Sequence, residues 1–244
     1  HLFTEQTRCE YDEKAGRFIH QDELKLGAIT IASQPSKQPL DKNERTKAWL
    51  NLFSKRGFSI FNEQPDSEQL LIRMSLASKL LPESFPRLNH DDLIADSQWL
   101  APYLDDIKNL EQLKKFNYSE AIKSCFDWQQ QSLLNEHLPL RLTVPSGSNV
   151  KVTYQLDGPA KLSVRMQEVY GMTSTPLLAQ GKLPLLMELL SPARRPLQLT
   201  QDLANFWQTS YRDVQKEMKG RYPKHFWPDD PATSQATNKV KSKM

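Results

Sequence analysis

Polar and apolar residues alternate along residues 8–12, and residues 18–32 become rich in β-branched side chains toward their end. Both patterns are typical of β-strands. Residues 14–17 supply turn-forming residue types between them, so residues 7–32 predict two strands joined by a turn. Two strands alone cannot bury a core. We therefore expect this hairpin either to pair with the next region or to be the end of a larger sheet domain.

Apolar residues recur every second position before the proline-containing linker at residues 34–39 and every three to four positions after it, which is the period of a helix. Residues 41–56 predict a helix that Asp41 caps and Gly57 ends. A proline inside a helix removes a backbone hydrogen bond, so the third of the predicted helices should kink or split at Pro102. The remaining helices of this module are predicted over residues 66–81, 90–107, 110–115 and 118–134.

Strand patterns return at residue 138. Residues 140–144 and 150–154 flank the turn residues 145–148, which predicts a β-hairpin. Residues 161–165 alternate, and the mostly apolar run 183–190 is typical of a central strand. A short strand over 197–199 can pair with it.

The last predicted helix covers residues 201–219, with Gly220 as its terminator and Pro223 preventing its continuation. One face of this helix is apolar, which makes it amphipathic. The face consists of Leu203, Phe206, Trp207, Tyr211, Val214 and Met218.

These elements predict an α+β protein in four parts. A short β-hairpin lies in residues 1–36, and a helical module covers residues 37–137. Residues 138–231 form an α+β domain with a small, mainly antiparallel sheet and a C-terminal amphipathic helix. Residues 232–244 are polar and basic without any hydrophobic period, which predicts a disordered tail.

Composition places the chain among globular proteins without a membrane span. Its 244 residues allow one large domain or two small ones, and 38% are hydrophobic. No apolar run approaches the length that crosses a bilayer, and the first residues resemble neither a signal peptide nor an initiator segment. Cys9 and Cys125 are far apart, as expected for unpaired thiols. We therefore expect a cytoplasmic chain that is part of a longer protein.

The charge distribution is uneven along the chain. From Ser191 onward there are ten Lys and Arg against five Asp and Glu, a net charge of +5, whereas residues 1–190 carry 22 against 24, a net charge of −2. A basic end indicates a phosphate-bearing or acidic partner. The alternative is that Lys239, Lys241 and Lys243 only keep a loose tail in solution.

Several catalytic patterns are missing from the sequence. It contains no Gly-x-x-x-x-Gly-Lys-[Ser/Thr] loop to cradle a nucleotide phosphate, no Gly-x-Gly-x-x-Gly and no Gly-x-Ser-x-Gly. The five histidines are scattered without metal-ligand spacing. The residues themselves therefore predict no catalytic site and no metal site.

Arg194 and Arg195 lie between Pro192 and Pro196, which restrict the backbone on both sides. Two guanidinium groups on a stiff turn can bind phosphates or carboxylates with paired hydrogen bonds. The alternative is a structural ion pair with Asp202 or with another carboxylate.

Residues 219–227 interleave cations with aromatic rings. Bases of RNA can stack on Tyr222, Phe226 or Trp227 while Arg221 and Lys224, with Lys219 beside them, neutralise phosphates. The alternative is that the aromatic rings anchor this end of the chain to the body and leave the cations exposed around them.

A series of short motifs runs from residue 99 to residue 231. They include Trp-Leu-Ala-Pro-Tyr-Leu at 99–104, Thr-Val-Pro-Ser-Gly-Ser at 143–148 and Arg-Met-Gln-Glu-Val-Tyr-Gly at 165–171. Others occupy residues 189–200 and 216–225. In this order and spacing they resemble the C-terminal region of bacterial HrpB-type ATP-dependent RNA helicases. Residues 1–98 fit more loosely.

The resemblance implies a parent protein of the DEAH/RHA type, a DExH-box ATPase whose RecA-like domains bind ATP and Mg²⁺. Those domains have no counterpart in this chain, so it implies no catalytic residue and no cofactor here. The hairpin in residues 1–36 would be the end of an OB-like β domain.

The function that the resemblance implies is that of an accessory C-terminal region, which docks on its own helicase core and contributes to RNA binding. The alternative is a protein-interaction module that recruits the helicase without contacting RNA. An independent enzyme is a third interpretation.

Overall fold

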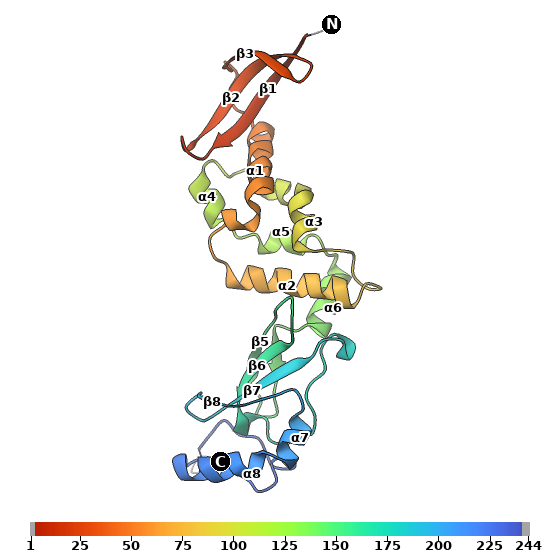
Figure 1. Ribbon diagram of the computed structural model, residues 1–244, viewed down its shortest axis with the longest axis vertical. Helices are drawn as coiled ribbons and strands as arrows, with labels where there is room; N and C mark the ends of the chain where they lie inside the picture. The colour runs from red at the N-terminus through yellow and green to blue at the C-terminus, as the bar shows by residue number, and fades with distance from the viewer. Residues whose placement is uncertain (1–2, 241–244) are drawn as a thin grey trace. The chain divides into compact units, whose positions relative to one another are not determined.

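The computed structural model describes residues 3–240 and divides into two compact units (Figure 1). The first unit comprises the chain up to residue 71 together with residues 88–127. The second comprises residues 72–87 together with the chain from residue 128 onward. This division follows tertiary contacts and does not coincide with the predicted boundaries at residues 36 and 137.

The first unit begins with a three-stranded antiparallel sheet in the order β1-β2-β3. Where two strands were predicted there are three, because the chain turns at Gly27 within the run predicted as one strand. Gly27 has φ 59°, a left-handed conformation that glycine adopts without steric cost. The OB-like assignment stays a prediction. The strands are β1 (Phe3–Asp12), β2 (Arg17–Leu26) and β3 (Ile29–Pro35).

Helix α1 (Lys42–Arg56) begins and ends at the predicted residues. The Asp41 carboxylate accepts a hydrogen bond of 2.7 Å from the backbone N–H of Glu44, whose own side chain accepts from the Asp41 N–H. This reciprocal capping box satisfies two N–H groups that would otherwise lack a partner. Gly57, with φ 57°, ends the helix.

Aromatic packing attaches α1 to the sheet of the first unit. Trp49 is fully buried, and its ring centroid lies 4.7 Å from that of Tyr11 and 4.8 Å from that of Phe18. Tyr11 and Phe18 lie at the turn end of β1 and β2, where they are paired across the two strands. The hairpin therefore buries its aromatic pair against the helix that follows it.

Two of the predicted helices are divided in the structure. Residues 90–107 split into an α-helix and a 3₁₀ helix that contains Pro102, which confirms the expected break. Residues 118–134 form two helices, because the chain tightens at Cys125 and Phe126 and brings the Phe126 ring into the core at 2% exposure. The helices are η1 (Gly57–Ile60), α2 (Pro65–Leu80), α3 (His90–Ala95), η2 (Gln98–Tyr103), α4 (Leu110–Lys115), α5 (Ser119–Lys123) and α6 (Trp128–His137).

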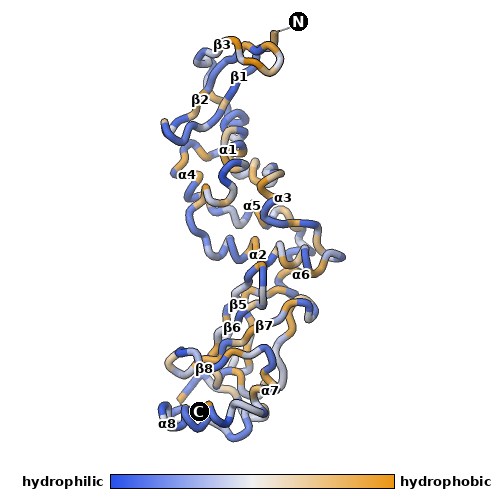
Figure 2. The backbone as a smooth tube through the Cα atoms, viewed as in Figure 1, coloured by the Kyte–Doolittle hydropathy of each residue, from blue (hydrophilic) through white to orange (hydrophobic). Residues whose placement is uncertain are grey.

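The second unit is built on a five-stranded sheet in the order β4-β5-β6-β7-β8. All pairs are antiparallel except β6 and β7, so the mainly antiparallel sheet is confirmed, and the apolar run at β7 is an inner strand. Apolar segments coincide with β6 and β7 in Figure 2. The strands are β4 (Arg141–Thr143), β5 (Asn149–Thr153), β6 (Ala160–Arg165), β7 (Leu185–Leu190) and β8 (Pro196–Thr200).

The single helix predicted over residues 201–219 is two helices, α7 (Leu203–Gln208) and α8 (Tyr211–Arg221). They separate at Thr209, whose hydroxyl donates to the carbonyl of Asn205 at 2.7 Å. The bend lets Trp207 and Tyr211 pack with ring centroids 5.3 Å apart. Helix α8 runs through Gly220 instead of ending there, and it stops before Pro223.

Buried polar contacts hold the segment that follows α8. Tyr211 donates its hydroxyl to the carbonyl of Pro228 at 2.8 Å, and Gln215 donates its amide to Asp229 at 2.9 Å. Gln215 is buried in the apolar face where Val214, which is only half-buried, was predicted. A glutamine stands in place of an apolar residue here because its amide donates hydrogen bonds to the buried backbone carbonyls of Trp227 and Pro228.

Residues 232–240, predicted as part of a disordered tail, follow a defined path on the second unit. Thr237 is 8% exposed, and its N–H donates to the carbonyl of Gln167 at 2.9 Å. The side chain of Gln167 donates in turn to the carbonyl of Lys239 at 3.2 Å. A polar segment without hydrophobic period is ordered here by backbone hydrogen bonds, which no periodicity reveals. Residues 241–244 lie outside the described residues.

Arg73 joins α2 to the C-terminal end of α6 within the second unit. The side chain is 1% exposed, and it donates to the carbonyl of Leu138 at 2.6 Å and to the Asn135 side chain at 2.8 Å. A longer hydrogen bond of 3.5 Å reaches the carbonyl of Leu134. Carbonyls at a helix end lack intrahelical partners and carry partial negative charge. The guanidinium therefore finds in one place the acceptors that its burial requires.

Two adjacent buried residues, Gln167 and Glu168, form a polar node at the end of β6. The Glu168 carboxylate accepts from Ser148 at 2.6 Å and from Arg165 at 2.9 Å, and its carbonyl accepts from the N–H of Ser146 at 3.2 Å. Burial disfavours the charged form, but the hydrogen bonds from Arg165 and Ser148 outweigh it and hold the pKa of Glu168 below its ordinary value.

Replacing Arg73 by Met tests the link between α2 and α6. Met keeps much of the volume but removes every donor, so the Leu138 carbonyl and the Asn135 side chain lose the hydrogen bonds from Arg73, and we expect a loss of about 2–4 kcal/mol in the free energy of unfolding. Urea denaturation followed by far-UV circular dichroism measures this change. Lys79→Met, an exposed change on the same helix, is the control and should cost less than about 0.5 kcal/mol. Equal stability of the two variants would contradict the conclusion that Arg73 stabilises the contact between α2 and α6.

Glu168→Gln tests the node through the pH dependence of stability. A carboxyl whose pKa is lowered on folding stabilises the fold above its unfolded pKa, and this contribution disappears as the pH falls through the folded value. The wild type should therefore exceed the Gln variant in stability near pH 7, and the difference should shrink below about pH 4. Urea denaturation across this pH range gives the comparison. A difference that is constant with pH would show that Glu168 is not charged in the folded protein.

Candidate nucleic-acid interface

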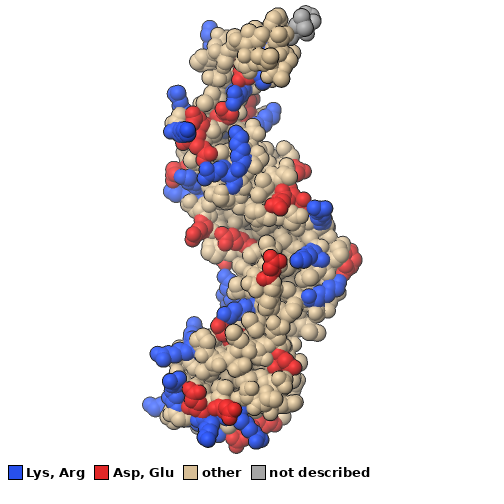
Figure 3. Space-filling view, viewed as in Figure 1, with Lys and Arg blue, Asp and Glu red and all other residues tan. Residues whose placement is uncertain are grey.

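The two units carry opposite net charges. The first unit has 14 Lys and Arg against 19 Asp and Glu, a net charge of −5, whereas the second has 18 against 10, a net charge of +8. Figure 3 shows Lys and Arg side chains gathered over the end of the second unit that holds β8 and α8, with acidic side chains among them. A polyanionic partner would therefore be attracted to the second unit.

The parallel pair β6 and β7 brings several loops to one edge of the five-stranded sheet. Arg165 and Leu190 are paired at the ends of the two strands, so the segments that follow them leave the sheet at the same edge. The β4–β5 turn reaches this edge as well, because the Ser146 N–H donates to Glu168. We call residues 144–148, 165–168 and 191–195 the basic edge.

Arg194 and Arg195 form part of a tight turn at the basic edge. Ser191 is 1% exposed and is hydrogen-bonded to both residues through its backbone. Its carbonyl accepts from the Arg194 N–H at 2.9 Å, and its N–H donates to the Arg195 carbonyl at 2.8 Å. Arg194 has φ 59°, a left-handed conformation that is strained for a non-glycine residue. Such strain persists where the surrounding structure imposes it, often at functional sites.

Both arginine side chains are exposed and lack ion-pair partners among the described residues. The alternative partner Asp202 accepts instead from the Asn205 N–H at 2.9 Å and caps α7. The turn therefore presents two guanidinium groups whose donors are free within residues 3–240.

The cations of the next predicted group lie on or after α8 and are exposed. Lys219 is 3.1 Å from the carboxylate of Asp229, and Arg221 is 3.6 Å from that of Glu217. Exposed ion pairs contribute little free energy, so these cations exchange partners readily. Lys224 is exposed and has no partner within the described part of the chain.

The two aromatic candidates behave differently from the cations. Trp227 is 4% exposed and donates its indole N–H to the carbonyl of Tyr222 at 3.1 Å. A buried ring cannot stack on a base, so Trp227 anchors the returning chain and is removed from the candidate contacts. Tyr222 is half-buried, with its ring 6.2 Å from that of His225.

His225 adds no charge to this region near pH 7. Burial and the nearby Arg165 both lower the pKa of His225 from its ordinary value. Its Nδ1 lies 3.0 Å from the side-chain oxygen of Gln167, so the ring is hydrogen-bonded to the polar node formed by Gln167 and Glu168.

Sequence reasoning missed a small hollow in the second unit, with a volume of about 200 Å³. We call it the polar hollow. Its residues come from the β4–β5 turn and from the segment that was predicted as disordered, so no motif united them. The only signal was the donor-rich composition of the last residues. The polar hollow is lined by Ser146, Gln235, Ala236, Thr237, Asn238 and Lys239.

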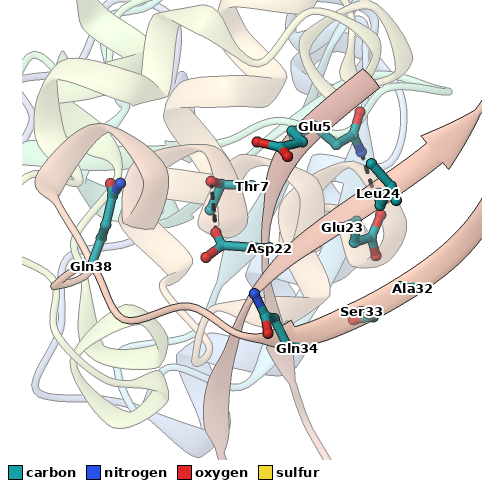
Figure 4. Close-up of a pocket in the computed structure, with 10 residues that line it drawn as sticks. Glu5, Thr7, Asp22, Glu23, Leu24, Ala32, Ser33, Gln34 and Gln38 are labelled. Atoms are coloured by element: carbon teal, nitrogen blue, oxygen red, sulfur yellow. Dashed lines mark hydrogen bonds between the residues drawn. The ribbon is translucent and has the colours of Figure 1, made fainter. Parts of the chain in front are cut away.

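The first unit has a larger hollow of about 560 Å³ on its three-stranded sheet, shown in Figure 4. Its lining includes the carboxylates of Glu5, Asp22 and Glu23, and it contains no Lys or Arg. Figure 4 shows Thr7 and Asp22 in contact across the two strands, a hydrogen bond of 3.1 Å. This acidic hollow repels a phosphate, in contrast to the polar hollow.

Within residues 3–240, no three His, Cys, Asp or Glu side chains gather in a way that could hold a metal ion. No helix in this part of the chain combines the length and the apolar content that crossing a bilayer requires.

The comparisons with known families match two regions of the chain. Residues 99–231 match the family described as "ATP-dependent helicase C-terminal". Residues 2–36 match the connector region of the ATP-dependent RNA helicase HrpB. The second match covers the three-stranded sheet of the first unit.

The chain is also similar over nearly its whole length to a curated protein and to two solved structures. The ATP-dependent RNA helicase HrpB of Escherichia coli (strain K12) is 41% identical over 242 residues, which cover 98% of this chain and 30% of that protein. A crystal structure of the E. coli DExH-box NTPase HrpB has a TM-score of 0.86 at 41% identity, over 98% of this chain and 30% of that one.

A second crystal structure, of the E. coli DEAH/RHA helicase HrpB, has a TM-score of 0.76 at 39% identity, over 93% of this chain and 29% of that one. The chain thus spans about 30% of the length of the relatives that it matches. Since the C-terminal family covers residues 99–231 in one continuous match, the chain belongs to the HrpB family and corresponds to the C-terminal region of these ATP-dependent helicases.

Proposed function

We propose that this chain is an accessory region of an ATP-dependent RNA helicase, which docks on the helicase core of its parent and contributes to RNA binding. The observation that supports the proposal is the concentration of positive charge in the second unit, whose basic edge carries Arg194 and Arg195 without an ion-pair partner among residues 3–240. Phosphate contacts by Lys and Arg supply most of the sequence-independent affinity for nucleic acids. Arg194, Arg195, Lys219, Arg221 and Lys224 are the proposed phosphate contacts, with Tyr222 beside them.

ATP and Mg²⁺ would bind to the motor domains of the parent and not to this region. Nothing in residues 3–240 offers a nucleotide-phosphate loop or a cluster of metal ligands. The role of this region would therefore be to position RNA or to hold the motor domains, while hydrolysis takes place elsewhere.

A second candidate function is a protein-interaction module that recruits the helicase and leaves RNA untouched. Two large apolar side chains of the second unit support it, since Trp128 is 84% exposed and Leu177 is 80% exposed. Exposed tryptophans are enriched among the residues that dominate protein–protein binding. The two functions differ in salt dependence, because counterion release weakens RNA binding steeply as salt rises.

RNA binding by the 244-residue chain tests the first function. Fluorescence anisotropy with a labelled single-stranded RNA should show binding at low salt that weakens at physiological salt. Replacing Arg194 and Arg195 together by Ala should make the negative slope of log K against log salt shallower by about 1.4, because each single-strand phosphate contact contributes about −0.7 to it.

A double variant in the first unit is the matched control for these arginines. Lys14→Ala/Arg17→Ala removes two exposed cations from the β1–β2 turn and should leave RNA affinity and slope unchanged. Absence of binding by the wild type at low salt would overturn the RNA-binding role and favour the protein-interaction module. An equal loss in both double variants would show that only net charge matters.

ATP hydrolysis tests the accessory status of the chain. With ATP and Mg²⁺ present, release of inorganic phosphate by the purified chain should equal the background without protein, with and without added RNA. The physical reason is that the sequence contains no Gly-x-x-x-x-Gly-Lys-[Ser/Thr] loop and that residues 3–240 hold no cluster of metal ligands. Turnover that persists through purification would show that the chain is an enzyme in its own right.

A further inference from the structure

The polar hollow of the second unit is lined almost entirely by hydrogen-bond donors. Its wall offers the ammonium of Lys239, the amides of Gln235 and Asn238, and hydroxyl groups of Ser146 and Thr237. Ala236 is the remaining lining residue, and no carboxylate belongs to the set. A site with one cation, several donors and no negative charge suits an anion with several acceptor oxygens.

The two walls of the polar hollow are held in place by hydrogen bonds to the polar node, Gln167 and Glu168. On one side, the Ser146 N–H donates to the Glu168 carbonyl at 3.2 Å, and Ser148 donates to the Glu168 carboxylate at 2.6 Å. On the other side, Gln167 holds Thr237 and Lys239 through their backbones at 2.9 and 3.2 Å. One pair of adjacent residues therefore sets the separation of the two walls. Such preorganisation lowers the entropic cost of binding.

Three of the lining side chains keep their donors available, whereas the Ser146 hydroxyl donates to the Ser148 hydroxyl at 3.1 Å. The side chains of Gln235, Asn238 and Lys239 are exposed, and none has a hydrogen bond or an ion pair to another described residue. The backbone of Lys239, in contrast, is engaged at both its N–H and its carbonyl. The backbone groups thus fix the segment, and within residues 3–240 these three side chains have no hydrogen-bond or ion-pair partner.

We propose that the polar hollow is a binding site for a phosphate group of the single-stranded RNA backbone, with Lys239 and Asn238 as its main contacts. The inference rests on the proposed RNA-binding function and adds a defined subsite to it. A volume of about 200 Å³ is several times the roughly 30 Å³ that one water occupies, so it accommodates a phosphate and its remaining hydration. The hollow borders the basic edge, so a strand bound here is adjacent to the edge that carries the arginine turn.

Asn238→Asp tests the site with a nearly isosteric change. It places a carboxylate in the hollow, and because Asn238 is exposed it does not disturb the core. In fluorescence anisotropy with a labelled single-stranded RNA, the negative slope of log K against log salt should become shallower by about 0.7, the value of one single-strand phosphate contact. The affinity should fall most at low salt, where the repulsion is least screened.

The matched control is Gln38→Glu, the same amide-to-carboxylate change in the acidic hollow of the first unit. It alters net charge equally and should leave the affinity and the slope unchanged. Lys239→Ala should make the salt dependence shallower to the same extent as Asn238→Asp does. Lys239→Arg retains the charge and should keep the salt dependence of the wild type. Unchanged binding in both Asn238→Asp and Lys239→Ala, while Arg194→Ala/Arg195→Ala still weakens it, would overturn the phosphate site and leave the proposed function intact.

Two further ligands distinguish the source of the phosphate. Inorganic phosphate, titrated into the ¹⁵N-labelled chain, should move the backbone amide signals of Ser146 and Asn238 only weakly, whereas the single-stranded RNA should move them at much lower concentration. A response to inorganic phosphate with none to RNA would assign the hollow to a free anion and overturn the proposal. A response to poly-glutamate that equals the response to RNA would assign it to an acidic peptide and also overturn it.

Discussion

Two adjacent polar residues at the end of an inner strand control the organisation of the second unit. Gln167 and Glu168 are both buried, so each of their polar atoms needs a partner, and these partners come from segments far away in the sequence. The Ser146–Ser148 turn, Arg165 and the chain around Thr237 are all tied to this point. The hydrogen bonds from Ser148 and Arg165 offset the cost of burying the Glu168 carboxylate, so the β4–β5 turn and Arg165 are needed together at this point.

Much of the fold could be predicted from the sequence because its signals are local. The cap at Asp41, the break at Pro102 and the hairpin around residues 145–148 depend on residue types at fixed spacing. The predictions that were wrong concern features that depend on tertiary packing. The bend at Thr209 serves the packing of Trp207 and Tyr211, and no window of sequence contains that requirement.

The candidate site was predictable only in part for the same reason. Arg194 and Arg195 could be identified because the flanking prolines mark a stiff turn, and the structure shows both side chains exposed. Trp227 belonged to an equally suggestive cluster, yet burial removes it from any surface role. The polar hollow could not be predicted, since its two walls are separated by most of the second unit in sequence and meet through Gln167 and Glu168.

The opposite net charges of the two units have consequences before any contact with a polyanion forms. A polyanion that approaches from a distance attracts the unit with net charge +8 and repels the unit with net charge −5. This difference favours encounter orientations in which the polyanion meets the basic unit. Such orientation raises the fraction of productive collisions, and it acts within about one Debye length, roughly 8 Å at physiological ionic strength. If the proposed RNA-binding function holds, the acidic unit would thereby contribute to recognition without touching the ligand.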